Sequence, residues 1–267
     1  MSSIRKLINQ TAIYGTSSII GRFLNFLLTP LYALQFSNEQ YGIITEMYAY
    51  VAFLVVFLTY GMETAFFRFS TTNKDGKLNI YSNTLYSLIT SSAIFVAMAT
   101  IFSENIADWL KYPNHQEYII WFSLIVSLDA VSSIPLAKLR LQEKAKKFAL
   151  VNLLNVGVNI FLNLFFLIYC KEAFESGHTN WITENLYNPK IGVGYVFISN
   201  LIASLIKFGV LMPTMSFKGA FDFTILKQMV SYAGPMLLVG LAYVVNETLD
   251  RAMLKSILFN QYLENGD

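Results

Sequence analysis

The chain has few charged residues, and most of them lie in short blocks between apolar runs. Charged side chains make up 13% of its 267 residues and hydrophobic side chains 55%, whereas soluble domains carry about 25% charged residues. The mean hydropathy is +0.48. This composition excludes an ordinary soluble domain and predicts a membrane protein.

Cysteine, histidine and the familiar catalytic motifs are also scarce. One cysteine, Cys170, excludes an intrachain disulfide and a cysteine-based metal cluster. The two histidines, His115 and His178, both fall in predicted loops. The sequence has no P-loop, GxGxxG, HExxH, GxSxG or DxD motif, and the longest predicted outer loop, 171–190, has no clustered carboxylates. We therefore expect no enzymatic activity, and no catalytic residues, metal or cofactor.

Seven apolar runs are long enough to cross a bilayer, because about 20 helical residues span a hydrocarbon core of about 30 Å. Lysine and arginine alternate between the loops: with the N-terminus inside, twelve lie on the cytoplasmic side and four on the outer side. The sequence therefore predicts an all-α, polytopic membrane helical bundle with a cytoplasmic N-terminus. The predicted spans are residues 11–36, 42–67, 80–102, 118–137, 148–170, 191–215 and 231–257.

The first span carries a polar face. Arg22 lies near its middle, and Ser18, Asn25 and Thr29 follow the spacing four, three, four that places side chains on one face of a helix. An arginine that faces lipid at this depth costs from about 3 to more than about 10 kcal/mol. Because residues 1–36 contain no carboxylate, we expect Arg22 to face protein or water. The alternative is a salt bridge to an acid on another helix.

Polar residues at helical spacing recur on three other spans, which predicts a shared water-accessible cavity. The alternative is that serine and asparagine only join helices by hydrogen bonds and close packing. In the fourth span, Asp129 is the candidate ion-coupling carboxylate and a possible partner of Arg22. The recurring stripes are Asn83, Ser87 and Thr90 in the third span, Asn152, Asn155, Asn159 and Asn163 in the fifth, and Asn200, Ser204 and Lys207 in the sixth.

Residues 216–230 differ from the spans. Aromatic and aliphatic side chains repeat there at every fourth position, with lysine and aspartate between them. This pattern predicts an amphipathic helix on the cytoplasmic surface. In the span that follows, Glu247 and Arg251 are four residues apart in the order that favours an ion pair.

Residues 14–69 resemble the first helical hairpin of the bacterial polysaccharide-biosynthesis flippases. These are Wzx-like O-antigen and capsule exporters of the multidrug/oligosaccharidyl-lipid/polysaccharide exporter superfamily. Residues 234–251 are similar to the family's seventh helix. Lipid II flippases of the superfamily carry a second arginine where this chain has Leu28, so that part of their site does not carry over. The similar features are Arg22, Pro30-Leu31-Tyr32, Glu39-Gln40-Tyr41-Gly42, and Gly61-Met62-Glu63 leading to Phe67-Arg68-Phe69.

The resemblance implies two six-helix lobes around a cavity that opens alternately to each face of the membrane. On this basis we expect residues 1–215 to form the N-terminal six-helix transmembrane lobe. Residues 216–230 would be the cytoplasmic amphipathic linker helix, and residues 231–267 the first helix of a truncated second lobe.

The resemblance also implies a cargo, an undecaprenyl-pyrophosphate-linked oligosaccharide flipped across the bacterial inner membrane for the synthesis of polysaccharide such as the O-antigen of lipopolysaccharide. Arg22 and Lys207 would hold the pyrophosphate, while Asn25, Asn155 and Asn159 would bind the rest of the head group. The expected partners are this substrate and membrane lipids, with other polysaccharide-assembly proteins as candidates and no nucleic acid.

Three alternatives remain at this point. A cation-coupled multidrug exporter of the same superfamily would use Asp129 for coupling. A membrane-embedded glycan polymerase or ligase would need a large outer loop with arginines or carboxylates, which the sequence lacks. A non-transporting assembly component would differ from a flippase in that its deletion would not cause undecaprenyl-linked intermediates to accumulate.

Overall fold

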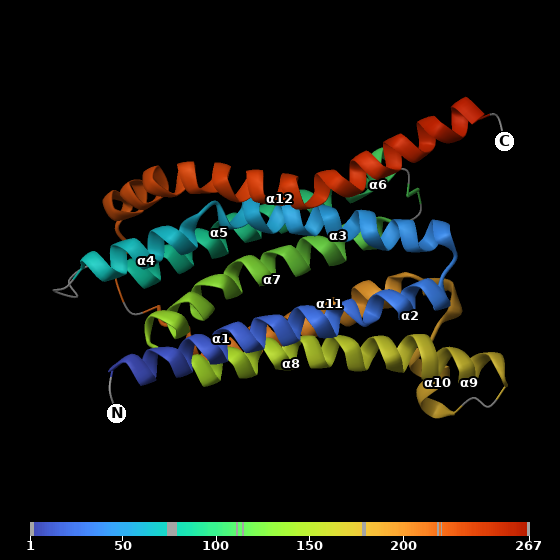
Figure 1. Ribbon diagram of the computed structural model, residues 1–267, viewed down its shortest axis with the longest axis horizontal. Coiled ribbons are helices and arrows are strands. Elements are labelled where there is room, and N and C mark those ends of the chain that lie inside the picture. The colour runs from blue at the N-terminus through green and yellow to red at the C-terminus, as the bar shows by residue number, and fades with distance from the viewer. Residues whose placement is uncertain are drawn as a thin grey trace.

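The computed structural model describes residues 3–73, 79–110, 112–113, 115–177, 180–217, 219 and 221–265. Over these residues the chain forms helices, turns and short irregular segments, and no strand occurs among them (Figure 1). Seven helical segments are long and apolar enough to cross a membrane. The all-α, polytopic bundle predicted from the sequence is confirmed.

The observed spans follow the predicted ones, with ends that differ by up to eleven residues. The first span is α1 (Ser3–Phe26) and α2 (Leu28–Gln35), and the second is α3 (Asn38–Thr59) and α4 (Met62–Thr72). The others are α5 (Ile80–Ile101), α7 (Gln116–Leu141), α8 (Ala145–Leu164) extended by a π-helix (Phe165–Cys170) and α9 (Lys171–Glu175), α11 (Gly194–Leu211), and α12 (Phe223–Asn265). Short helices α6 (Ser103–Trp109) and α10 (Trp181–Leu186), with 3-10 turns Pro189–Ile191 and Met212–Thr214, lie in the connections.

Two of the spans are broken for identifiable reasons. Pro30 has no N–H to donate to the carbonyl of Phe26, four residues earlier, and α1 ends at that residue. In the second span, Tyr60 and Gly61 both adopt the left-handed conformation, with φ of 35° and 73°. A Cβ on Gly61 would lie 2.5 Å from the carbonyl oxygen of Ala233. Glycine therefore allows α12 to approach the break between α3 and α4 closely.

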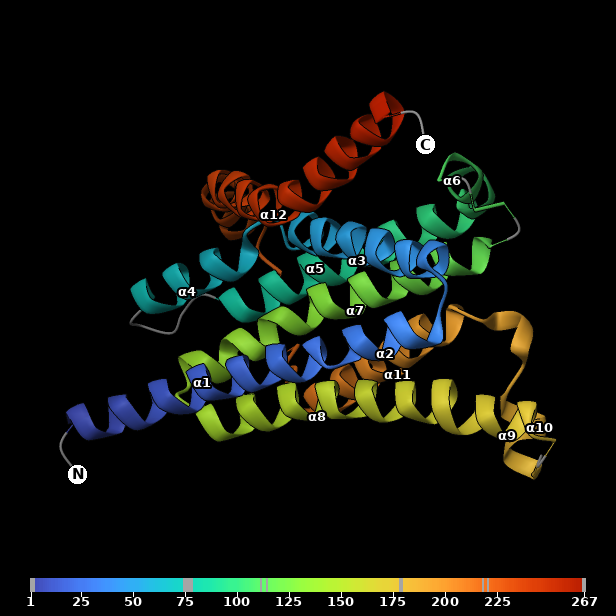
Figure 2. The same ribbon diagram turned by 45° about the vertical axis from the view of Figure 1, so that its right-hand side comes forward.

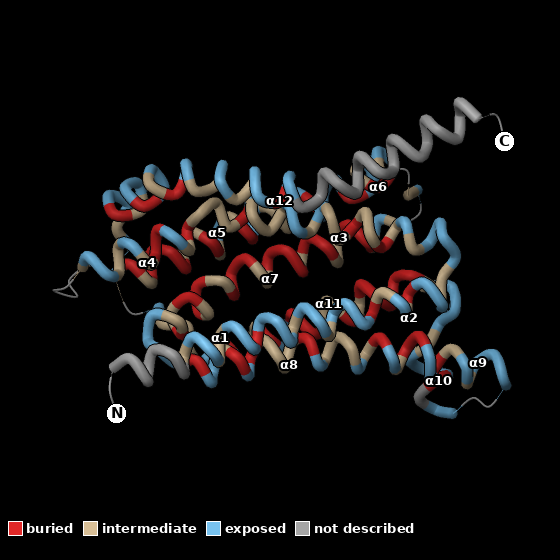
Figure 3. The backbone as a smooth tube through the Cα atoms, viewed as in Figure 1, coloured by how far each residue is buried: buried red, intermediate tan, exposed pale blue. Residues whose placement is uncertain are grey.

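Helix α7 is the centre of the bundle. It packs against α3, α5 and α11, and Figure 3 shows it as the most continuously buried helix. Helix α1 packs mainly on α8, and α12 packs on α3, α4 and α5 at the opposite side of α7. Figure 2 shows α1, α2, α8 and α11 on one side of α7, and α4, α5 and α12 on the other. A polar cavity forms where α3 faces the first of these groups.

The loops that carry most of the predicted cytoplasmic lysines and arginines gather at one end of the bundle. The end of α4, the α7–α8 turn and the connection from α11 to α12 all lie at the end where the N-terminus lies (Figures 1 and 2). The α2–α3 turn and helices α6, α9 and α10 lie at the other end. The spans therefore alternate in direction, as the charge pattern predicts.

The predicted amphipathic helix over 216–230 is wrong in its extent. Residues 215–217 and 221–222 are not helical, and α12 begins at Phe223 and continues into the seventh span without a break. Asp222 sets this start, because its carboxylate accepts hydrogen bonds from the N–H groups of Thr224 (2.8 Å) and Ile225 (3.2 Å). The Asp222 N–H in turn donates to the buried Asn83 side chain at 2.8 Å. The predicted Glu247–Arg251 pair lies outside the side chains that the structure describes.

Candidate functional site: a polar cavity beside the first span

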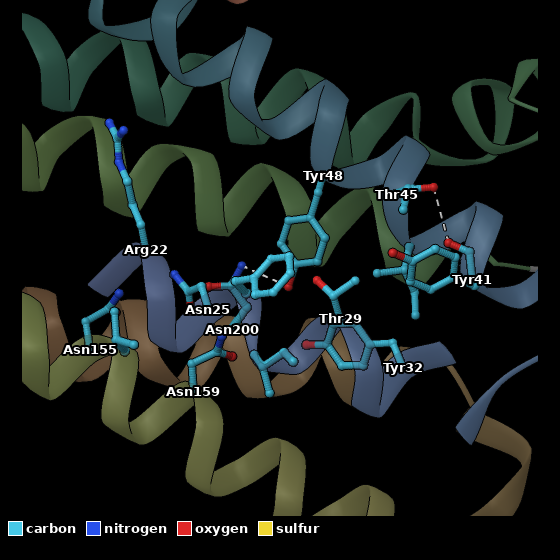
Figure 4. A pocket seen from close by; sticks show the side chains of 14 residues that line it. Arg22, Asn25, Thr29, Tyr32, Tyr41, Thr45, Tyr48, Asn155, Asn159 and Asn200 are labelled. Carbon is cyan, nitrogen blue, oxygen red and sulfur yellow. Dashed lines mark hydrogen bonds between the residues drawn. The ribbon is translucent and has the colours of Figure 1, made fainter. Parts of the chain in front are cut away.

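A cavity of about 790 Å³ lies between α1, α2, α3, α8 and α11. Ligand-binding pockets commonly have volumes of about 300–1,000 Å³. Arg22 and Asn25 are exposed, so the cavity is open along this part of α1. Its polar lining consists of Arg22, Asn25, Thr29, Tyr32, Tyr41, Thr45, Tyr48, Asn155, Asn159 and Asn200 (Figure 4).

The polar face predicted for the first span lines this cavity over most of its length. Arg22, Asn25 and Thr29 contribute to the lining, and Arg22 extends away from its helix (Figure 4). Ser18 is not part of the lining, and its hydroxyl donates to the carbonyl of Tyr14 in the same helix at 2.9 Å. Among the described side chains, Arg22 forms no ion pair. The alternative prediction, a salt bridge from Arg22 to another helix, is therefore not what the structure shows.

Two members of the fifth-span stripe, Asn155 and Asn159, line the cavity, and a third is structural. Asn163 is fully buried, accepts a hydrogen bond from the hydroxyl of Tyr32 at 3.1 Å and donates to the backbone carbonyl of Asn159 at 2.8 Å. The side-chain oxygen of Asn155 has no hydrogen-bond partner among the described residues.

The sixth-span stripe divides between the cavity and the interior. Asn200 lines the cavity and donates to the hydroxyl of Tyr48 at 3.3 Å. Lys207 is buried, and its Nζ lies 2.6 Å from Oδ1 of Asp129, which also accepts from the hydroxyl of Ser204 at 3.0 Å. Neither Lys207 nor Asp129 lines the cavity. The structure thus brings Arg22, Asn25, Asn155 and Asn159 together and places the other two candidates in a separate ion pair.

The two acids of the second span, Glu46 and Glu63, also have partners within the protein. Glu46 accepts hydrogen bonds from the hydroxyls of Tyr50 (3.1 Å) and Tyr112 (2.8 Å). Burial raises the pKa of Tyr112, which lies outside the spans, and the hydrogen bond to Glu46 acts in the same direction. Glu63 pairs with Arg140. Among the described residues no carboxylate lines the cavity, so its fixed charge is the single positive charge of Arg22.

The second span also contributes to the cavity, which the sequence pattern of asparagine and serine does not predict. Tyr41, Thr45 and Tyr48 of α3 line the cavity together, and Tyr32 completes a group of three phenols. Their spacing of four and three residues is the same signal that identified the face of Arg22. Tyrosine is common both at membrane interfaces and in protein cores, so its presence alone does not indicate a cavity lining.

The cavity combines one guanidinium, four amide side chains, three phenols and two threonine hydroxyls. Amides and hydroxyls both donate and accept hydrogen bonds, as sugar hydroxyls do, and guanidinium binds phosphate oxygens through two parallel hydrogen bonds. The described residues include no group of three or more histidine, cysteine or acidic side chains that could hold a metal ion. The lining is therefore suited to a polar ligand with a negative charge.

Fold and cavity together define a multi-pass helical membrane protein with a polar cavity between its spans. The chain belongs to the polysaccharide biosynthesis protein family, whose model matches residues 35–263. This match confirms the resemblance to Wzx-like polysaccharide-biosynthesis exporters. It begins after Arg22 and Asn25, so the roles of these two residues depend on the cavity geometry alone. No curated protein and no solved structure matches the chain.

Proposed function

We propose that this protein flips an undecaprenyl-pyrophosphate-linked oligosaccharide across the bacterial inner membrane during polysaccharide biosynthesis. The proposal rests on one observation: in a protein of this family, the cavity is lined by one arginine and, among the described residues, by no aspartate or glutamate. A carboxylate-free lining does not repel a pyrophosphate, and the cavity opens along α1, where a lipid tail could remain in the bilayer.

Each part of the lining has a distinct role in this proposal. Arg22 binds the pyrophosphate, because its guanidinium can donate two parallel hydrogen bonds to phosphate oxygens. Asn25, Asn155 and Asn159 donate and accept hydrogen bonds with the sugar hydroxyls and donate hydrogen bonds to the bridging oxygens of the pyrophosphate. Tyr48, held by Asn200 at 3.3 Å, offers an aromatic ring and a hydroxyl to the sugar.

The ion pair of Asp129 with Lys207 argues against the alternative of a cation-coupled drug exporter. A coupling carboxylate must exchange its cation during transport, whereas Asp129 is held by Lys207 and Ser204 outside the cavity. Lys207 likewise has its partner within the protein, and we now assign it to Asp129 rather than to the pyrophosphate.

The proposal is tested in cells that lack their own polysaccharide flippase, with the natural full-length protein supplied from a plasmid. Wild type should restore surface glycan, and Arg22→Ala should not, although it reaches the membrane in normal amounts. Cells with Arg22→Ala should accumulate undecaprenyl-linked intermediates. Ser18→Ala, on the same helix but outside the cavity lining, is the control and should restore glycan fully. If Arg22→Ala restored surface glycan as fully as wild type, the proposed role of Arg22 would be contradicted.

A further inference from the structure

A second polar cavity, of about 380 Å³, lies at the end of the bundle where α7 turns into α8 and α11 leads to α12. Three lysines line it, Lys138 from the last turn of α7 and Lys144 and Lys147 from the start of α8. Residues 213–216, between α11 and α12, complete the lining together with Leu139 and Gln142. Among the described residues no aspartate or glutamate contributes to the lining.

Lys138 is held at one wall of this cavity. Its Nζ donates to the carbonyl of Thr214 at 3.1 Å and lies 3.8 Å from the centre of the Tyr81 ring. An ammonium group has three N–H donors, and the bond to Thr214 uses one. The side chain is therefore fixed in place with donors left for a ligand.

The start of α8 adds positive potential to the same place. This helix has no acidic residue in its first turn and no side-chain cap, so its first N–H groups are not satisfied by a cap. The N-terminus of a helix carries a partial positive charge, so nearby lysines are repelled by it. An anion bound between the lysines and the helix N-terminus removes this repulsion. The neighbouring acid Glu143 does not line the cavity, and its carboxylate accepts a hydrogen bond from the Gln10 side chain of α1 at 3.3 Å.

We infer that this cavity binds the phosphate group of an anionic membrane phospholipid. It lies beside the last turn of α7, a spanning helix, at the end of the bundle that the charge pattern assigns to the cytoplasm. Lipid headgroups occupy this depth, and the cytoplasmic leaflet carries the anionic lipids that basic pockets between helices recognise. The inference does not depend on the proposed transport function, since none of these lysines lines the cavity of Arg22.

The test uses native mass spectrometry of the purified full-length protein with phosphatidylglycerol and with phosphatidylcholine of the same acyl chains. Wild type should retain phosphatidylglycerol preferentially. The double substitution Lys144→Gln/Lys147→Gln should weaken that retention about tenfold or more, because each lysine near a phosphate contributes a charge-assisted contact. Lys146→Gln is the matched control, since Lys146 is exposed in the same helical turn but does not line the cavity.

Three results would overturn the inference. The first is equal retention of the two lipids by wild type. The second is a loss in Lys146→Gln as large as that in the double variant, which would indicate general attraction to an anionic surface. The third is complete displacement of the lipid by millimolar inorganic phosphate, which would assign the lysines to free phosphate instead. Both lysines in the double variant are exposed, so its melting temperature should match wild type and show that the fold is intact.

Discussion

Removing one partner of the Lys207–Asp129 pair should destabilise the protein strongly. The two charges lie 2.6 Å apart, and the side chains retain 9% and 27% of their exposed area. Breaking a buried ion pair by removing one partner costs about 3–5 kcal/mol. Asp129 is partly exposed and keeps the hydroxyl of Ser204 at 3.0 Å, so we expect Lys207→Met to cost about 3 kcal/mol, the lower end of that range.

This loss is measurable as a shift in melting temperature. With about 2–4 °C per kcal/mol for a chain of this size, Lys207→Met should melt about 6–12 °C below wild type. Size-exclusion chromatography after heating, with a fluorescent fusion in detergent, measures the shift. The double variant Asp129→Asn/Lys207→Met removes both charges and should recover to within about 1 kcal/mol of wild type. Lys227→Met, at an exposed position, is the control and should leave the melting temperature unchanged.

The double variant also separates structure from transport. Because neither side chain lines the cavity, a stably expressed double variant should export glycan as wild type does. Two results would refute the reasoning: a double variant that melts as low as Lys207→Met, or a stable double variant that cannot export.

Two further predictions follow from the fold. Gly61→Ala should lower the melting temperature by about 5 °C or more, since φ of 73° and a carbonyl 2.5 Å from the new Cβ leave no room for it. Gly42→Ala, at a helical position with nothing within 4 Å, should be neutral or stabilising by up to about 1 kcal/mol, and equal losses in the two variants would contradict the close approach of α12. In a background without the native cysteine, an impermeant thiol reagent applied to intact cells should label Asn38→Cys and spare Gln142→Cys, both exposed positions. The reverse labelling would overturn the orientation.

The arrangement of the spans was largely predictable because hydropathy and loop charge vary along the chain itself. The polar face of Arg22, Asn25 and Thr29 was predictable for a similar reason. Helical spacing alone places these residues on one face, whichever helices pack beside it. Tyr41 and Tyr48 follow the same rule on the second span. They could have been found by extending the search from asparagine and serine to tyrosine.

The ion pair and the linker show what sequence spacing does not determine. Lys207 and Asp129 are 78 residues apart and meet only because α11 packs on α7. Helix α12 starts at 223 because Asp222 caps it and Asn83, from a different span, holds Asp222 in place. Both depend on which helices are neighbours, and periodicity along one segment contains no information about that.

The most direct test of the account is translocation by the purified full-length protein in liposomes. Undecaprenyl-pyrophosphate-linked oligosaccharide is placed in both leaflets, and an enzyme outside the liposomes modifies the sugars that it can reach. Wild type should expose the protected half of the substrate. Arg22→Ala should leave it protected, and Arg22→Lys should give partial exposure, because lysine retains the charge without the forked hydrogen bonds of arginine. Full exposure by a correctly folded Arg22→Ala variant would contradict the claim that this arginine binds the pyrophosphate.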